Sequence, residues 1–338
     1  MSGPLPPVLQ PLGLPASWIY QFAVARRNAR FERQGATRRL PVPVVSVGNI
    51  TVGGTGKSPV TRWIARRLMA SGARPAIALR GYRSRGGVSD EACEHEALLP
   101  GVPVIVGADR FASVQAAMDR GVFFDCLVLD DGFQHRQLHR DLDVVLIDRR
   151  RPGLDGRLLP FGWLREPPSA LARADAVLVT NAEHPDPELA ARIERWHGRP
   201  PLGWFRHAWS GLQVHDQAGS RRVEVAWLAG RRVATALGIG NPAGIVRRIE
   251  DAGAEVVEQV PLEDHAAFGP RTVRRLAASF RGADTLLVTR KDWAKLERVI
   301  DSAFVGPVAV PLLEVQPVAE IGAFGAMLDA IASAARSE

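Results

Sequence analysis

Residues 51–58 read Thr51-Val52-Gly53-Gly54-Thr55-Gly56-Lys57-Ser58. They follow an apolar run at 43–47 that is typical of a buried strand, and they precede a stretch at 59–70 whose apolar residues recur at helical spacing. A glycine-rich loop between a strand and a helix is the setting of a Walker A motif, where backbone N–H groups and the helix N-terminus face phosphate oxygens. The sequence therefore predicts a nucleotide-binding loop at 51–58, although Thr51 stands where the strict motif has glycine.

Polar side chains at two places would carry the chemistry of this site. Lys57 would reach the β- and γ-phosphates of ATP, and the Ser58 hydroxyl would ligate Mg²⁺. A second apolar run, 126–129, ends in Asp130 and Asp131. In P-loop enzymes a carboxylate here holds Mg²⁺, and two adjacent acids repel each other unless a cation lies near them. An acidic cap on the next turn is the alternative, but the upstream loop favours a role in Mg²⁺ binding.

The order of apolar and helical segments predicts the fold class. Strands are expected at 44–47, 76–79, 102–106, 126–129, 144–147 and 176–180, with helices between them, for example at 59–70 and 110–120. This alternation is typical of an α/β protein, here a P-loop NTPase-type domain with a mostly parallel sheet. Residues 203–229 instead resemble a β-hairpin with its turn at 216–220.

After the hairpin the α/β alternation resumes. Strands are expected at 233–239 and 285–289, and helices at 244–252, near 293–300 and at 321–335. The predicted divisions are an N-terminal helix region at 1–27, a P-loop domain at 28–205, a two-stranded linker at 206–230 and a smaller α/β domain at 231–338.

Composition restricts the class of protein. The 338 residues are 46% apolar and 23% charged, which is ordinary for a globular chain of roughly two domains. The net charge is +7, but only three of the 43 basic residues are lysines, Lys57, Lys291 and Lys295. This excess of arginine reflects genome composition, and the arginines are scattered, so no nucleic-acid partner is expected. Cys93 and Cys126 lack metal-ligand spacing and indicate a reducing compartment.

The N-terminal segment leaves two interpretations open. Residues 1–25 carry no charged side chain, and prolines interrupt most of the run. The part that can be helical, 16–25, would be about 15 Å long, half of the roughly 30 Å that a span requires. Arginines begin at Arg26. Such a helix can lie in a membrane interface or pack on its own domain.

The stretch after the second strand carries a family resemblance. Residues 130–143 read Asp130-Asp131-Gly132-Phe133-Gln134-His135-Arg136-Gln137-Leu138-His139-Arg140-Asp141-Leu142-Asp143. This stretch closely resembles the tetraacyldisaccharide 4'-kinase family. Further matches follow in the same order: Val47-Gly48-Asn49, Arg80-Gly81-Tyr82, Asp90-Glu91, Leu158-Leu159-Pro160, Leu164-Arg165-Glu166-Pro167, Gly238-Ile239-Gly240-Asn241-Pro242, Asp264-His265 with Phe268, and Thr289-Arg290-Lys291-Asp292.

The resemblance implies a kinase of lipid A biosynthesis. Such a kinase transfers the γ-phosphoryl group of ATP, with Mg²⁺, to the 4'-hydroxyl of a tetraacylated disaccharide 1-phosphate, the lipid A precursor. It would act as a peripheral protein at the cytoplasmic face of the bacterial inner membrane, which the N-terminal helix would touch. The resemblance also implies a P-loop domain and a smaller α/β domain joined by a two-stranded linker.

The resemblance also assigns roles to individual residues. It implies that Asp90 is the general base, with His265 as its partner, and that Glu91 and Glu166 join the Mg²⁺ shell. Arg165 would stabilise phosphate charge. From the residues alone, Asp90 would be an exposed loop acid, His265 a residue at a helix start, and Arg165-Glu166 a surface pair. The family's Gly-Asp-Glu-Pro is here Ser89-Asp90-Glu91-Ala92, so the loop around the base departs from the pattern.

Other P-loop classes fit less well. A membrane-associated switch ATPase without a lipid acceptor is the alternative function, but its loop has a second lysine where this chain has Val52. A GTPase would need a lysine and an aspartate two positions apart after a late strand, whereas Lys291 and Asp292 are adjacent.

Overall fold

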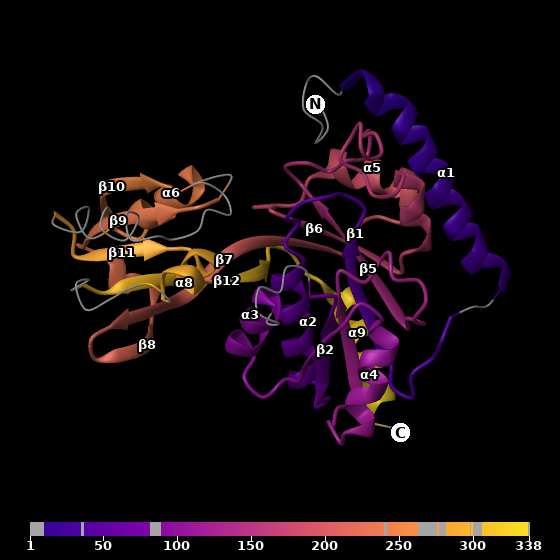
Figure 1. The fold of residues 1–338 in the computed structure, drawn as a ribbon, viewed down its shortest axis with the longest axis horizontal. Coiled ribbons are helices and arrows are strands. Elements are labelled where there is room, and N and C mark those ends of the chain that lie inside the picture. Colours follow the sequence, from indigo (N-terminus) through magenta and orange to yellow (C-terminus); the bar gives the residue numbers. More distant parts are fainter. Residues whose placement is uncertain are drawn as a thin grey trace. The chain divides into compact units, whose positions relative to one another are not determined.

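The computed structural model describes residues 10–34, 37–81, 89–239, 242–262, 276, 282–297, 299 and 306–336. The chain divides into two compact units (Figure 1). Unit 1 comprises Met1–His207 and Val315–Glu338, and unit 2 comprises Ala208–Glu314.

Unit 1 is built on a parallel sheet. Its strands are β1 (Val44–Asn49), β2 (Pro75–Leu79), β3 (Val104–Val106), β4 (Cys126–Asp130), β5 (Leu142–Asp148), β6 (Ala176–Thr180) and the start of β7 (Gly203–Asp216). They lie in the order β7-β6-β5-β1-β4-β2-β3, and each neighbouring pair in this order is parallel. All residues of β1, β2, β4 and β6 are buried, as expected for a parallel sheet covered on both faces.

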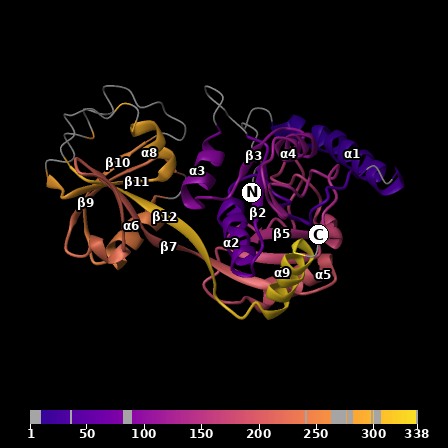
Figure 2. The ribbon, with the colours of Figure 1, turned by 90° about the horizontal axis from the view of Figure 1, so that it is seen from below.

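Helices cover both faces of this sheet (Figure 2). The helices of unit 1 are α1 (Gln10–Gln34), α2 (Lys57–Ala70), α3 (Asp90–Leu98), α4 (Arg110–Asp119), α5 (Pro187–His197) and α9 (Gly322–Ala335), with a short 3-10 helix η2 (Pro168–Arg173). Side chains of α2, α3 and α9 pack with the sheet residues that face one side, and those of α4 and α5 with the residues that face the other.

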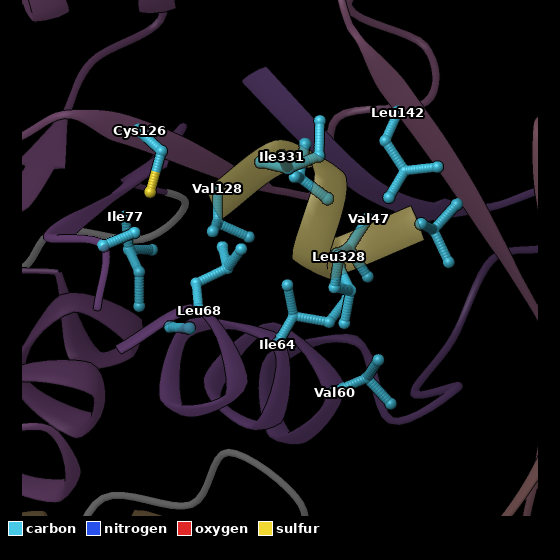
Figure 3. Close-up of a cluster of buried hydrophobic side chains, with 14 of the residues drawn as sticks. Val47, Val60, Ile64, Leu68, Ile77, Cys126, Val128, Leu142, Leu328 and Ile331 are labelled. Carbon is cyan, nitrogen blue, oxygen red and sulfur yellow. The ribbon is translucent and has the colours of Figure 1, made fainter. Parts of the chain in front are cut away.

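The apolar residues of α2 that recur at helical spacing form the core between this helix and the sheet. Val60, Ile64 and Leu68 recur at helical spacing, and all three are fully buried. All three belong to one cluster with Val47 and Val128 of the sheet and Leu328 of α9, and Figure 3 shows Leu68 beside Val128 and Ile64 beside Leu328. The helix that opens at the phosphate loop is therefore fixed by a large apolar contact, and so is the loop at its N-terminus.

Unit 2 has its own sheet, with the order β10-β9-β11-β12-β7 and with β8 antiparallel to β7. Its further strands are β8 (Gly219–Val223), β9 (Arg232–Leu237), β10 (Glu255–Pro261), β11 (Thr285–Val288) and β12 (Val308–Pro317). Its helices are α6 (Ala243–Asp251) and α8 (Arg290–Leu296), with a short 3-10 helix η3 (Val225–Leu228). Two apolar clusters form its interior.

The prediction of an α/β fold with a mostly parallel sheet is confirmed, and the strands expected in unit 1 differ from the observed ones only at their ends. The predicted divisions differ from the observed units in two respects. Residues 315–338 belong to unit 1, because Phe324 and Leu328 of α9 are buried in the core with α2. The hairpin β7–β8 is part of the sheet of unit 2, and the chain passes between the units along β7 and β12.

Candidate nucleotide and phosphate site

Asn49, the last residue of β1, organises the phosphate loop. Its fully buried amide Nδ2 donates to the hydroxyl oxygens of Thr51, at 3.2 Å, and Thr55, at 2.9 Å. Its Oδ1 accepts from Nζ of Lys57 at 3.4 Å. A single side chain thus holds both ends of the loop and the lysine. Asn49 was part of the family resemblance but not of the predicted site, although its place as a polar residue at the end of a buried strand is the signal that marks it.

The glycines of the loop leave room for a phosphate group. Gly53 has φ 121° and Gly56, which caps α2, has φ 80°, so both lie in the left-handed region that glycine adopts without strain. A Cβ atom on Gly53 or Gly54 would meet nothing within 4 Å, whereas one on Gly56 would lie 2.7 Å from Cε1 of His207. The loop is therefore closely packed at its base and open above Gly53 and Gly54, which fits a bound phosphate.

Asp130, at the end of β4, is buried and is held by two neighbours. Nε2 of His95 on α3 lies 2.9 Å from its Oδ2, and the Ser58 side chain also hydrogen-bonds the carboxylate. Burial by itself would raise the pKa of Asp130. The hydrogen bond and charge of His95, together with Ser58 and Lys57, outweigh burial and lower that pKa below its ordinary value. Asp130 is an ionised acceptor next to the Ser58 hydroxyl.

Asp131 faces two cations. Nζ of Lys57 lies 3.6 Å from its Oδ1, and Nη1 of Arg165 donates to both carboxylate oxygens at 2.9 and 3.0 Å. Asp131 adopts φ 55°, a left-handed conformation that aspartate tolerates better than most residues. This conformation follows the last residue of β4, so the adjacent carboxylates of Asp130 and Asp131 have different partners.

Helix α3 brings further acids to the site. Ser89 caps the helix by accepting from the backbone N–H of Ala92, and Asp90 is its first residue. Partial burial, followed by the negative charges of Asp130 and Asp131, raises the pKa of Glu91. The charge of Glu91 is therefore influenced by both acids of the pair, and its place in a Mg²⁺ shell stays a prediction. The structure places Asp90 only through its backbone, and His265 lies outside the described residues.

Glu166 has a different environment from the one predicted. Its two oxygens accept from Nη1 and Nη2 of Arg173, each at 2.8 Å, from Asn28 at 2.9 Å and from Gln134 at 3.0 Å. Burial would raise its pKa, but these donors, Arg173 first, lower it. Both oxygens are therefore engaged, and Mg²⁺ would have to displace Arg173. Its role as a Mg²⁺ ligand is not supported, and the carboxylate instead ties α1 to Gln134 and Arg173.

No three His, Cys, Asp or Glu side chains converge closely enough to enclose a metal ion within the described part of the chain. In kinases, Mg²⁺ usually binds one or two carboxylates together with substrate phosphates and water. The donors that fit such a site are Ser58, Asp130 and Asp131, with Glu91 beside them.

Comparison with known proteins identifies the family. The family model described as tetraacyldisaccharide-1-P 4'-kinase, LpxK, matches residues 9–332. The chain belongs to this family. It is 35% identical over 325 residues to the tetraacyldisaccharide 4'-kinase of Geobacter sulfurreducens, covering 90% of this chain and 89% of the relative. It is 39% identical over 310 residues to that of Anaeromyxobacter dehalogenans strain 2CP-C, covering 84% and 80%.

A solved member of the LpxK family has the same fold. The structure of LpxK from Aquifex aeolicus, determined in complex with ATP, superposes with a TM-score of 0.72 at 27% identity and covers 94% of this chain and 98% of that protein. The predicted family and activity are confirmed: the chain is an enzyme, a tetraacyldisaccharide 4'-kinase of lipid A biosynthesis. The switch-ATPase alternative is thereby set aside.

Proposed function

We propose that the LpxK-family activity of this chain uses the phosphate loop to hold Mg·ATP and the first turn of α3 to meet the acceptor hydroxyl. The observation that carries this proposal is the convergence of Lys57, Ser58, Asp130 and Asp131 beside an open glycine loop. Phosphoryl transfer depends mainly on positioning and charge neutralisation, which such a cluster supplies.

The loop residues divide the work of nucleotide binding. We propose that the backbone of residues 51–56, Thr51, Val52, Gly53, Gly54, Thr55 and Gly56, surrounds the phosphates and that Lys57 contacts the transferred group. The contacts of Lys57 with Asn49 and Asp131 support this role, because they hold the ammonium group over the loop. Arg165, held by Asp131, places a second positive charge nearby.

Magnesium fits the donor set at this site. We propose Ser58, Asp130 and Asp131 as the residues that hold it, with Glu91 in the surrounding shell. Bound there, Mg²⁺ would supply positive charge to the phosphate oxygens. The support is the 2.9 Å contact that orients Asp130 and the Ser58 hydroxyl beside the same carboxylate, since hydroxyl and carboxylate oxygens are ligands that Mg²⁺ prefers.

Asp90 is proposed as the base for the sugar hydroxyl, with His265 as its partner. The support is the family motif at both residues and the position of Asp90 one residue before Glu91. An isolated aspartate, with a pKa of about 3.9, is a weak base at neutral pH. A histidine partner that orients or accepts the proton would correct this weakness.

One face of α1 is proposed to lie on the membrane. Trp18, Ile19 and Phe22 are 70%, 73% and 70% exposed. No described helix is both long and apolar enough to span a bilayer. This combination supports a peripheral protein that binds the cytoplasmic face of the inner membrane through the interfacial region 1–27.

An apolar cavity of about 310 Å³ lies within unit 1 beside this face. Leu14 and Trp18 of α1 and Leu158, Phe161 and Pro167 contribute to its lining. We propose that it receives part of an acyl chain of the lipid A disaccharide precursor. Residues 28–205 and the returning segment 315–338 would form the kinase domain, and the smaller domain would comprise 231–314 with the hairpin at 206–230, whose strand β7 serves as the linker.

The experiment that tests the base is label transfer from γ-labelled ATP to tetraacyldisaccharide 1-phosphate in detergent micelles. Removing a general base usually lowers the rate by about 10²–10⁴-fold. We expect Asp90→Asn to lower kcat by that factor while ATP binding stays unchanged. Asp119→Asn, an exposed acid on α4, is the matched control and should retain full activity. Normal lipid labelling by Asp90→Asn would contradict the assignment, and labelled phosphate without labelled lipid would contradict the kinase reaction itself.

A further inference from the structure

Helix α3 presents two polar side chains to the acid pair. Glu91 and His95 are four residues apart, so they lie on the same face of the helix. His95 has no exposed surface, and its Nε2 lies 2.9 Å from Oδ2 of Asp130, which is 4% exposed. The contact joins a histidine that no motif marks to the carboxylate beside Ser58.

The direction of this hydrogen bond follows from the two groups. Nε2 of His95 lies at hydrogen-bond distance from Oδ2 of Asp130, and a carboxylate can only accept. Nε2 of His95 therefore carries the hydrogen. Its other ring nitrogen, Nδ1, is buried and has no hydrogen-bond partner among the described residues. A buried polar atom without a partner is costly, so the ring is retained for its bond to Asp130 rather than for packing alone.

A second buried contact joins α3 to the phosphate-loop helix. Nη2 of Arg62 on α2 lies 3.1 Å from Oε1 of Glu94, the residue before His95, and Arg62 is only 1% exposed. Arg62 is four residues after Ser58 and so lies on the same side of α2. The two pairs connect α3 both to the helix that carries Ser58 and to the strand that carries Asp130.

These contacts oppose a repulsion. Partial burial first, and then the charges of Asp130 and Asp131, raise the pKa of Glu91, so the first turn of α3 carries a carboxylate near two like charges. Without an attachment, repulsion would favour a longer separation between α3 and the end of β4. The His95 bond supplies an attachment one helical turn from Glu91.

We propose that His95 is a positioning residue: it fixes Oδ2 of Asp130, leaves the rest of that carboxylate for Ser58 and Mg²⁺, and holds the first turn of α3, with Asp90 and Glu91, against the acid pair. This inference rests on the proposed magnesium role of Asp130. Partners that orient a ligating group commonly change metal affinity or activity by about 10–100-fold when they are removed.

The test measures binding and turnover separately. Calorimetry would follow the affinity of a non-hydrolysable ATP analogue with Mg²⁺ and with EDTA in the wild type, His95→Leu and His95→Gln. We expect His95→Leu to bind the ATP analogue about 10–100-fold more weakly than the wild type when Mg²⁺ is present. With EDTA, the two proteins should bind the analogue with the same affinity. His95→Gln retains an N–H donor at a similar reach and should recover most of the loss.

A second buried histidine provides the matched control. His197 of α5 is 6% exposed, and its ring nitrogens lie 3.0 Å from the backbone oxygens of Ala174 and Arg199. His197→Leu removes the same group and should lower the melting temperature without changing the Mg²⁺ dependence. If His95→Leu behaves in the same way, His95 is only structural and the proposal is wrong.

Two further variants keep the test decisive. If His95→Leu does not fold, His95→Asn replaces it in the test. The asparagine amide is too short to reach Asp130, so His95→Asn should lose the Mg²⁺-dependent affinity that His95→Gln keeps. Equal Mg²⁺-dependent affinity in His95→Asn and His95→Gln would overturn the proposal. Asp130→Asn tests the underlying site. If nucleotide affinity in Asp130→Asn keeps its full Mg²⁺ dependence, the magnesium assignment is refuted. If Asp130→Asn loses that dependence but His95→Leu keeps it, only the role of His95 is refuted.

Discussion

At the scale of single residues, the site depends on partners far away in the chain. Lys57 lies between Asn49 and Asp131, and Asp130 lies between Ser58 and His95. Each charge thus has a compensating neighbour within the protein, which limits the cost of burying it. The same arrangement fixes the direction of each charged group before a substrate binds.

His135, in the stretch that carries the family resemblance, leads to a prediction about pH. Burial and then the charge of Arg110, whose Nη1 lies 3.4 Å from Nδ1, lower its pKa to about 4. Between pH 6.5 and about 4 only the unfolded chain binds this proton, so His135 makes the folded state less stable as the pH falls through that window. His135→Gln should therefore reduce the loss of melting temperature between pH 7 and pH 5.

Thermal melts across that pH range, at constant ionic strength, would check this effect. His139→Gln, at a partly exposed histidine beside Asp141, is measured in parallel as the comparison variant. An unchanged slope in His135→Gln would show that this histidine does not contribute to the acid sensitivity.

At the scale of elements, α1 has two different faces. Ser17 donates to the carbonyl oxygen of Leu158 at 2.5 Å, Tyr20 to that of Arg165 at 3.1 Å, and Asn28 to Glu166 at 2.9 Å. These bonds attach the helix to the segment that carries Arg165. The large apolar side chains nearby, Trp18, Ile19 and Phe22, remain exposed. One face of the helix therefore packs on its own domain, as one of the two interpretations from the sequence predicts, and contact of the exposed face with a membrane stays a proposal.

The exposed face of α1 predicts membrane binding that can be removed without unfolding. Burying one large apolar side chain contributes about 1.5–3 kcal/mol. The variant Trp18→Ser, Ile19→Ser, Phe22→Ser should therefore bind vesicles of bacterial inner-membrane lipids at least about tenfold more weakly, measured by co-sedimentation. Ser17→Ala changes the packed face and should retain vesicle binding. Equal recovery of the triple variant and the wild type would contradict an interfacial role.

At the scale of the whole molecule, the polypeptide forms unit 1 from two separated segments. The chain leaves along β7 and returns along β12, and α9 then packs with α2 beneath the sheet. Trp63 of α2 stacks on Phe324 of α9 with the ring centroids 6.2 Å apart. The helix behind the phosphate loop thus depends on the last residues of the chain.

Leu328 on α9 allows this dependence to be measured. It is fully buried, and removing a buried leucine side chain to alanine costs about 2–5 kcal/mol. Leu328→Ala should lower the free energy of unfolding by that amount in urea titrations. It should also reduce nucleotide affinity at urea concentrations close to the unfolding midpoint. Met69→Ala, at a 44% exposed position of α2, should change stability by less than about 0.5 kcal/mol. Similar small effects of both changes would mean that α9 does not support unit 1.

Contiguous motifs were predictable, and contacts between elements were not. Residues 51–58 and the pair Asp130–Asp131 could be assigned because their chemistry follows from adjacent residues at the ends of buried strands. Strands β10 and β12 were not expected. In β10 the exposed residues Glu255, Glu258 and Gln259 hide the strand pattern, and Pro311 interrupts that of β12.

The sequence by itself determined the α/β class, the phosphate loop and the family, since each depends on local spacing or on a motif of consecutive residues. Only the tertiary structure decided that His95 contacts Asp130, that Asn49 holds the phosphate loop, that Arg173 pairs with Glu166, and that residues 315–338 complete unit 1. The physical reason is that hydrogen bonds and buried ion pairs depend on distances of about 3 Å between elements. Those distances are set by how the helices pack on the sheet, and no local pattern along the chain records them.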